Sequence, residues 1–304
     1  MVQGSALKAS ETPLEKEGQL KRIQQYIARM PSLSTTMSKV MEICNRPDAS
    51  PNDLNRVISL DPVLTGLVLK LINSAYYSLP NQVTSLARAI IMLGINTVKN
   101  LALSTAILQS VGGKDSFKAF SMDTFWTHSI TVGVTGKALS GLKGIPGTQK
   151  EEYFVSGLIH DLGKIPLGNC FPEEYVQVME TARTENILLI DAEAKILGTD
   201  HCMVGGMIAE KWELGGALRG SLVHHHRPET AEESNRTHVH MISLADACTH
   251  AFEREPSEGD PLQDPILVSA LQEVGVSPES VNEVRESVLK EIDKAKVFLQ
   301  ATKG

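Results

Sequence analysis

A histidine and an aspartate stand side by side in the middle of the chain, within the segment SGLIHDLGKIP at residues 156–166. An apolar run leads into His160 and Asp161, and such a pair at the end of a buried helix is costly to desolvate unless a charged group receives it. A divalent metal ion would receive it, because neutral imidazole and carboxylate are ligands of zinc, iron, manganese and nickel. Lys164 follows three residues after Asp161, so a continued helical turn would bring it to the same face. The alternative is a plain helix C-terminus, with His160 solvated and Lys164 facing the negative end of the helix dipole.

Four further segments of the second half offer side chains of the same type. Their ligand-type residues are His128, His201, the histidine run 224–226 and Asp246. Asp246 lies in the apolar helical segment ISLADA, where a buried carboxylate needs a partner. Together with the central pair, these segments make five helices or helix ends that carry metal-type ligands. Because five separate segments carry such ligands, we favour one metal site that they share.

Each of these residues also has a structural explanation when it is taken alone. A histidine on an apolar face, such as His128, is often a core residue with one hydrogen bond, and His201 can belong to the cap of the helix that follows it. The triple histidine can form a solvated turn, and Asp246 can pair with Arg219 or Arg236. The metal hypothesis therefore depends on the five segments together.

The composition is that of a folded protein with reduced cysteines. Of the 304 residues, 42% are hydrophobic and 21% are charged, which is typical of globular chains rather than disordered ones. The net charge of −7 offers no broad basic surface, so we expect no nucleic-acid partner. The cysteines are far apart and form no CxxC pair, which predicts free thiols rather than a disulfide framework. These residues are Cys44, Cys170, Cys202 and Cys248.

The sequence also predicts where the protein resides. No apolar stretch approaches the roughly 20 residues that span a bilayer. The N-terminus lacks the charged-then-apolar pattern of a signal peptide. We therefore expect a cytoplasmic protein with no membrane partner.

Helical periodicity runs through most of the chain and predicts an all-α fold. In the first half, Met37, Val40 and Cys44 belong to one apolar stripe at helical spacing. Asp61 before Pro62 is typical of an N-cap followed by proline at the first helical position. No long run alternates with period two, so we expect no sheet.

The helices are expected to form an N-terminal bundle packed on a second helical domain that carries the ligand segments. Glycine-rich or loop-like sequence near residues 112–115 and 255–265 separates the parts. The predicted divisions are a flexible leader at 1–18, the N-terminal bundle at 19–113, the metal-binding helical domain at 114–254, and a C-terminal loop and helix at 255–304.

The order of the ligand-type residues resembles that of the HD superfamily of metal-dependent phosphohydrolases. His128 matches the first histidine, His160-Asp161 the namesake pair and Asp246 the closing aspartate. The HD-GYP branch is similar at further positions, namely Lys164 for its HDxGK form, His201 with Gly205 for its HxxxG element, and His225-His226 for its paired histidines. Here Arg227-Pro228-Glu229 follows the paired histidines in place of the glutamate and GYP segment of the cyclic dinucleotide phosphodiesterases.

The first half resembles the HDOD family, which also pairs such a bundle with an HD-like half. The resemblance covers roughly residues 20–252, and family members are bacterial signalling or regulatory modules that often lack part of the metal set. This chain keeps the whole set. The matching segments of the bundle are Met30-Pro31 with the stretch through Val40, residues 60–62, residues 71–75 and residues 89–94.

The resemblance implies a site for two divalent transition metal ions, which we expect to be iron, manganese, nickel or zinc. Asp161 would bridge the ions, and Asp161 and Lys164 would be the catalytic residues of any hydrolysis. His225 and His226 can both bind only if their helix ends there, because neighbours on a helix point about 100° apart. The expected ligands of one ion are His128, His160 and Asp246, and those of the other are His201, His225 and His226.

Three classes of function are compatible with this set. The first is a regulatory HDOD signal-transduction module with a structural or ligand-sensing metal site, and we favour it. The second is a metal-dependent phosphohydrolase or phosphodiesterase that acts on a nucleotide or cyclic nucleotide. The third is a di-iron oxygenase. A phosphate-containing small molecule and a signalling protein are the expected partners.

Overall fold

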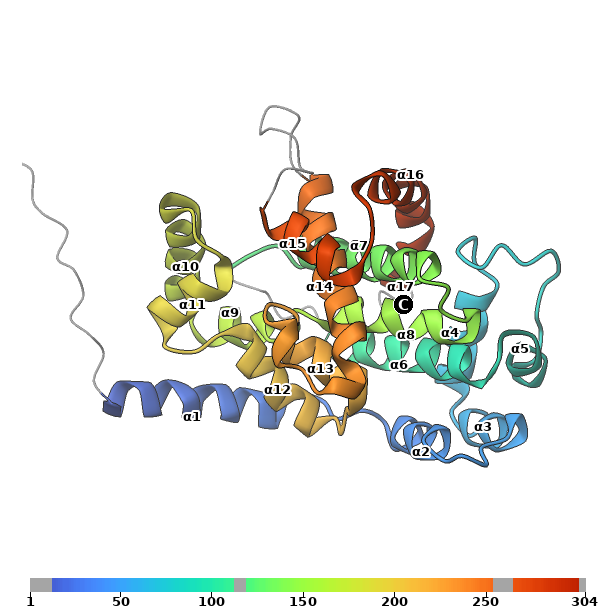
Figure 1. Cartoon of the computed structure of the whole chain (residues 1–304). Helices are drawn as coiled ribbons and strands as arrows, with labels where there is room; N and C mark the ends of the chain where they lie inside the picture. Colours follow the sequence, from blue (N-terminus) through green and yellow to red (C-terminus); the bar gives the residue numbers. More distant parts are fainter. Residues whose placement is uncertain (1–12, 112–118, 254–264, 301–304) are drawn as a thin grey trace, which may run out of the picture.

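The computed structural model describes residues 13–111, 119–253 and 265–300, which form an all-α fold (Figure 1). No strand occurs in these three ranges, so the predicted fold class is confirmed. The helices of the first half are α1 (Pro13–Arg29), α2 (Thr35–Cys44), α3 (Pro51–Ile58), α4 (Pro62–Ile72), α5 (Leu86–Leu93) and α6 (Ile95–Val111).

Short turns join the helices of the second half. They are α7 (Met122–Leu142), α8 (Gly147–Ile159), α9 (Lys164–Cys170), α10 (Pro172–Glu185), α11 (Leu189–Leu197), α12 (His201–Lys211), α13 (Gly216–His224), the 3-10 turn η1 (Pro228–Thr230) and α14 (Glu233–Glu253). The chain ends with α15 (Pro265–Val274), α16 (Pro278–Ala295) and α17 (Val297–Gln300).

Local signals in the sequence explain where several helices of the first half begin and end. The Asp61 carboxylate accepts a hydrogen bond from Leu64 N at 2.9 Å and caps α4, as predicted. α5 ends at Gly94, whose φ of 87° lies in the region that glycine adopts readily. Met37 and Val40, from the predicted stripe, are both buried. The bundle therefore follows from capping and periodicity.

The first helix begins within the segment that was predicted as a leader, residues 1–18. α1 begins at Pro13, so residues 13–18 are helical. This stretch is too polar to show the apolar stripe on which the prediction relied, and the buried positions of α1, Ile23 and Ile27, come later. Residues 1–12 lie outside the described residues, as do the predicted boundaries at 113/114 and 254/255.

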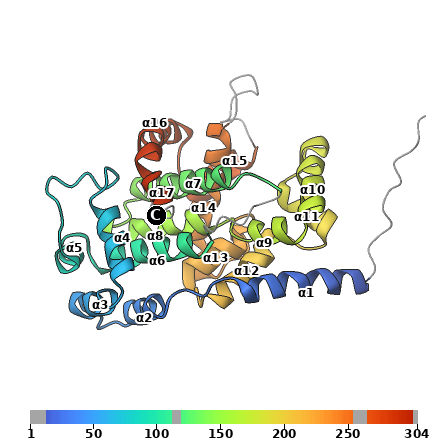
Figure 2. The same cartoon turned by 180° about the vertical axis from the view of Figure 1, so that it is seen from behind.

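α1 packs against the second half of the chain. It lies along α9 and α12 in both views (Figures 1 and 2). Arg22 donates a hydrogen bond to the carbonyl oxygen of Cys170 at 2.6 Å, at the end of α9. The N-terminal helix therefore contacts the two helices that begin with Lys164 and His201.

Two glycines allow α7 and α8 to touch in the centre of the molecule. A β-carbon at Gly157 would lie 2.5 Å from the backbone nitrogen of Gly133, so a side chain at this position would force the helices apart. α6 packs on α8, and α14 and α16 pack on α7. The close approach places His128, on α7, near His160 at the end of α8.

A second glycine contact joins the turn after α8 to the start of α12. A β-carbon at Gly163 would overlap the carbonyl oxygen of His201 and would lie 2.8 Å from Gly205 N. Gly205 in turn faces α13, where its β-carbon would lie 2.9 Å from the carbonyl oxygen of Leu222. Three helix ends can therefore meet around Asp161.

The structure agrees with two further features of the sequence. All four cysteines are unbridged. Among the helices that the structure describes, none has the length and apolar character needed to cross a bilayer.

Candidate metal centre

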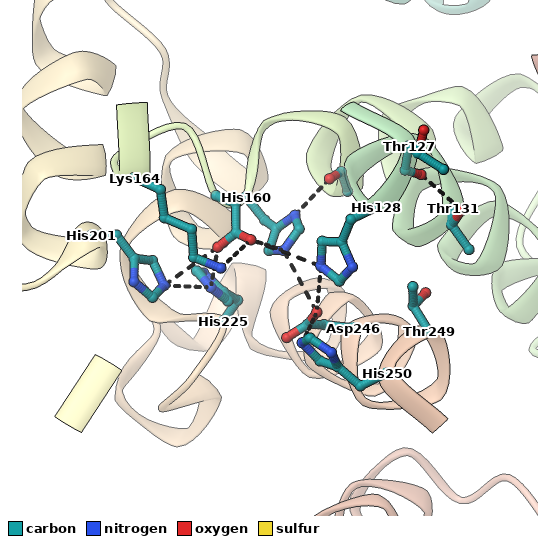
Figure 3. Close-up of polar contacts among 12 residues, drawn as sticks. Thr127, His128, Thr131, His160, Lys164, His201, His225, Asp246, Thr249 and His250 are labelled. Atoms are coloured by element: carbon teal, nitrogen blue, oxygen red, sulfur yellow. Dashed lines mark hydrogen bonds and ion pairs between the residues drawn. The ribbon is translucent and has the colours of Figure 1, made fainter. Parts of the chain in front are cut away.

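The seven ligand-type residues predicted from the sequence converge on one site. Figure 3 labels five of them, which point toward one another: His128, His160, His201, His225 and Asp246. They come from five different segments of the second half. His128 lies on α7, His160 caps the end of α8, Asp161 follows it in the turn, His201 opens α12, His225 and His226 follow α13, and Asp246 lies on α14.

One group of donors is formed by His128, His160 and Asp246, whose nearest ligand atoms all lie within 4.8 Å of one another. Oδ1 of Asp246 lies 3.1 Å from Nε2 of His128 and 3.7 Å from Nε2 of His160. Both imidazoles and the carboxylate therefore point into the same small volume. This is the group that the sequence assigned to the first ion.

The second group is formed by His201, His225 and His226, which meet the same 4.8 Å limit. Nε2 of His201 lies 3.3 Å from Nε2 of His225. α13 ends at His224, and His225 is its C-cap. Because the helix ends there, the two neighbouring histidines can face one volume, as the sequence required.

Asp161 lies between the two groups and directs one carboxylate oxygen to each. Its Oδ2 lies 3.2 Å from Nε2 of His160 and 3.8 Å from Nε2 of His128. Its Oδ1 lies 3.4 Å from Nε2 of His201 and 3.7 Å from Nε2 of His225. A carboxylate in this position has the geometry of a bridge between two cations.

The hydrogen bonds of three imidazoles turn their Nε2 atoms inward. Nδ1 of His160 lies 2.7 Å from the carbonyl oxygen of Gly157, and Nδ1 of His225 lies 2.8 Å from that of Ser221. Only an N–H can satisfy a carbonyl oxygen, so the neutral rings carry their protons on Nδ1. Nδ1 of His201 is held in the same way by a carboxylate, described below. Each Nε2 then offers its lone pair to the centre.

Unsatisfied polar atoms show that these residues fit a metal ion. Within the described part of the chain, Nε2 of His160 and Oδ1 of Asp161 are buried and have no hydrogen-bond partner. Buried polar atoms normally have one. Two imidazole lone pairs 3.3 Å apart, on His201 and His225, also repel each other unless a proton or another cation lies between them. A divalent ion in each group would satisfy all of these atoms.

The electrostatics of the site reflect this crowding of donors. Burial alone would raise the pKa of Asp161, but the electrostatic influence of His160 and Lys164 outweighs it and holds the pKa well below its ordinary value. Burial opposes protonation of His225, yet the nearby Cys202 and Asp161 raise its pKa to about 9. Burial also lowers the pKa of His226 well below its ordinary value, with the charges of His225 and His201 adding to the effect. Metal binding would displace any proton on these nitrogens and would therefore depend on pH.

Lys164 and His250 lie on the more open side of the site. Nζ of Lys164 donates to Oδ2 of Asp161 at 2.5 Å, and 15% of its side chain is exposed. His250, one turn after Asp246 on α14, places its Nε2 3.4 Å from Oδ1 of that residue with 58% of its side chain exposed. His224 instead faces Thr230, with Nδ1 2.7 Å from the hydroxyl oxygen, and belongs to neither group.

Sequence reasoning missed two residues of the site, Glu193 and His250. Glu193 is fully buried on α11 and accepts hydrogen bonds from His201. A signal was present, because Ile190, Glu193 and Leu197 form a stripe at helical spacing and a carboxylate in such a stripe needs a partner. The same argument applied to Asp246 had identified that residue.

The chain matches the family model of the HDOD domain over residues 30–228. An HDOD domain protein with unknown function from Geobacter sulfurreducens has a TM-score of 0.70 at 22% identity, over 93% of this chain and 98% of that one. A "putative signal transduction protein" from Marinobacter aquaeolei has a TM-score of 0.69 at 18% identity, over 95% and 67%. A "putative metal-dependent phosphohydrolase" from Shewanella amazonensis has a TM-score of 0.62 at 19% identity, over 94% and 98%. At these identities the likeness is one of fold.

A Treponema pallidum protein described as "Uncharacterized protein" is 22% identical over 223 residues. The match covers 73% of this chain and 42% of that protein, so it spans less than half the length of the relative.

Proposed function

Because this chain belongs to the HDOD family, we propose that it is a signal-transduction protein whose second half holds a dinuclear transition-metal site. The observation that carries the proposal is the position of Asp161, with one carboxylate oxygen directed to each group of imidazoles. A structural salt bridge would need only one such partner. Two groups of nitrogen donors around a single buried carboxylate suit two ions.

In this proposal the seven residues form two ligand sets and a bridge. His128, His160 and Asp246 hold one ion, His201, His225 and His226 hold the other, and Asp161 bridges them. Histidine-rich sites favour iron, manganese, nickel or zinc over magnesium. When bound, such a pair of ions supplies Lewis acidity and a place for a phosphate group. We infer that the ligand is a phosphate-containing small molecule.

A regulatory role is supported by how the two halves are connected. α1 lies against α9 and α12, and these helices begin with Lys164 and His201. A protein partner that shifts α1 would therefore act on two elements of the site. The solved "putative signal transduction protein" from Marinobacter aquaeolei has a similar fold.

Phosphohydrolysis is the second candidate, and the position of Lys164 favours it. Its ammonium group touches Asp161 at the partly open side of the site, where it can stabilise negative charge on a phosphate. The substrate would then be a nucleotide or cyclic nucleotide. Glu229 follows the paired histidines only after Arg227 and Pro228, which argues against the cyclic dinucleotides of the HD-GYP branch.

Metal analysis and a turnover assay on the full chain test these proposals together. The protein is purified without chelator or nickel resin, stripped, and titrated with manganese, iron or zinc. We expect two ions per chain in the wild type, fewer in Asp161→Ala, and no robust hydrolysis of a nucleotide or a phosphodiester. Absence of metal binding would refute the site. Metal-dependent hydrolysis that is lost in Asp161→Ala would establish the enzyme in place of the regulatory module.

A further inference from the structure

Glu193 holds one imidazole of the candidate metal centre from behind. It lies on α11, and its side chain is completely buried. Its Oε2 accepts hydrogen bonds from Nδ1 of His201 at 2.6 Å and from the backbone nitrogen of His201 at 2.8 Å. Both contacts concern the same residue, so they fix the position of its backbone and the rotation of its ring.

Tyr175 fixes Glu193 in turn. Its hydroxyl, on α10, donates to the other carboxylate oxygen, Oε1, at 2.5 Å, and the tyrosine is itself buried. α10 and α11 lie side by side as a hairpin at one end of the molecule (Figures 1 and 2). The carboxylate therefore connects this hairpin to the first residue of α12.

The carboxylate determines which nitrogen of His201 faces the centre. An ionised carboxylate can only accept hydrogen bonds, so Nδ1 of His201, which faces it, carries a proton whether the ring is neutral or charged. The other nitrogen, Nε2, then lies 3.4 Å from Oδ1 of Asp161. Histidines that bind metals commonly donate their second ring nitrogen to a carboxylate, which orients the ring and raises its basicity.

We propose that Glu193, held by Tyr175, is the positioning residue that presents Nε2 of His201 to the second metal ion, so that the α10–α11 hairpin sets the affinity of that half of the site. The part that concerns metal affinity rests on the proposed function. The part that concerns the imidazole does not, because its hydrogen bonds are made by residues of the chain alone.

The competing explanation is that Glu193 only stabilises the start of α12. A carboxylate near a helix N-terminus is favourable, and Glu193 does accept the first backbone N–H of this helix. Asp200 already caps α12, however, by accepting from Met203 N at 2.8 Å. A pure cap would affect the stability of the fold but would leave the His201 ring and the metal stoichiometry unchanged.

The test uses the full chain with zinc as the probe. Glu193→Gln keeps the size of the side chain and removes its charge, and Tyr175→Phe removes only the hydroxyl. Glu185→Gln is the matched control, because Glu185 also joins α10 to α11, through Lys195 at 2.6 Å, and is exposed. Calorimetric titration counts the ions and measures each affinity, and nuclear magnetic resonance follows the Nδ1 proton of His201 with and without zinc.

In the wild type and in Glu185→Gln we expect two zinc ions and a slowly exchanging, strongly downfield Nδ1 proton. In Glu193→Gln the second ion should bind about 10–100-fold more weakly, and the proton signal should move upfield or disappear. Tyr175→Phe should change the affinity for the second ion and the position of the proton signal in the same directions, but by less. This variant tests the positioning role if Glu193→Gln fails to fold.

Two results separate the inference from the proposal on which it rests. Wild-type affinity for both ions and an unchanged Nδ1 signal in Glu193→Gln or Tyr175→Phe would overturn the positioning role and leave the metal site standing. A wild type that binds no zinc would refute the metal site and the effect of the hairpin on it. In that case, a downfield Nδ1 proton of His201 that is lost in Glu193→Gln would still show that Glu193 orients the imidazole ring.

Discussion

The ammonium group of Lys137 on α7 lies 3.1 Å from the hydroxyl oxygen of Tyr76 and 4.5 Å from the centre of its ring. Tyr76 belongs to the N-terminal half, so this contact crosses between the two halves of the chain. Lys137 also forms an ion pair with Glu151 on α8, whose side chain is almost completely buried. A single cation thus ties the N-terminal half to the two central helices.

Removing that cation should destabilise the protein strongly. Lys137→Met leaves the carboxylate of Glu151 buried without its partner, and we expect a loss of about 3 kcal/mol in the free energy of unfolding. The double variant Lys137→Met, Glu151→Gln removes both charges and should lie within about 1 kcal/mol of the wild type. Urea denaturation measures both. Lys195→Met, which breaks the exposed pair with Glu185, is the control and should cost less than about 1 kcal/mol. Equal losses in the two single variants would contradict the role of burial.

The close contact of Gly163 with α12 predicts that a side chain at this position destabilises the protein. Gly163→Ala places a methyl group against the backbone of His201, so either the turn after α8 or the start of α12 must move. We expect a loss of about 1–3 kcal/mol in stability and weaker metal binding, because His201 and Asp161 lie on the two sides of this contact.

Gly66→Ala is a suitable control for the Gly163→Ala variant. Nothing lies within 4 Å of a β-carbon at Gly66 in the middle of α4, so alanine there should stabilise the protein by about 0.5–1 kcal/mol. A Gly163→Ala variant as stable as the wild type would show that the backbone has room to relax.

Much of the candidate site could be predicted because its residues carry local signals. His160 and Asp161 end an apolar helix, and Asp246 lies in an apolar helical face. The sequence around each residue therefore predicts a buried polar group that needs a partner. The structure brings these segments together, although their role as metal ligands stays a prediction. Capping signals such as Asp61 before Pro62 also gave the helix starts correctly.

The remaining features depend on contacts between distant segments, which leave little trace in the local sequence. Glu193 lies between the exposed residues Asp191 and Lys195 on α11, so its spacing from Ile190 and Leu197 is a weak signal of burial and does not identify His201 as its partner. Likewise, nothing near Lys137 or Tyr76 indicates that they meet across 61 positions of sequence. Such contacts depend on how whole helices pack, so the sequence pattern of a single helix cannot predict them.

His238 makes the stability depend on pH in a defined direction. Its ring stacks on Tyr153 with centroids 3.9 Å apart, its Nε2 lies 2.8 Å from the Ser156 hydroxyl, and burial lowers its pKa to about 4. In the unfolded chain its pKa is about 6.5, so between these values the unfolded state binds a proton that the folded state does not. Stability contributed by neutral His238 is therefore complete above about pH 6.5 and is lost as the pH falls toward 4, at no more than about 1.4 kcal/mol per pH unit.

Urea denaturation of metal-free protein between pH 7 and pH 4.5 measures this contribution. His238→Gln cannot gain a proton, so its stability should fall less steeply with acid than that of the wild type. The histidines of the metal centre titrate in both proteins and cancel in the comparison. His240→Gln, on the same helix, controls for the loss of a histidine as such and should follow the wild type. Parallel curves for wild type and His238→Gln would show that the ring takes up its proton in the folded state at an ordinary pH.

The position of Asp161 between the two histidine groups leads to a prediction about metal and stability together. An ion that binds only the folded state stabilises it by mass action, by about 2.7 kcal/mol at a free concentration of 100 times the dissociation constant. Asp161→Ala removes the carboxylate that faces both groups, so it should lower the melting temperature more in zinc-loaded protein than in protein stripped of metal. Some loss is expected even without metal, because Lys164 and the two histidines nearest Oδ1 lose their negative partner. Asp191→Ala, an exposed change on α11, should leave the gain from zinc intact. Scanning calorimetry of the three proteins, each with and without zinc, gives the comparison. If Asp161→Ala lowers the melting temperature by the same amount in both states, the carboxylate is a structural counter-charge for its neighbours and does not bridge metal ions.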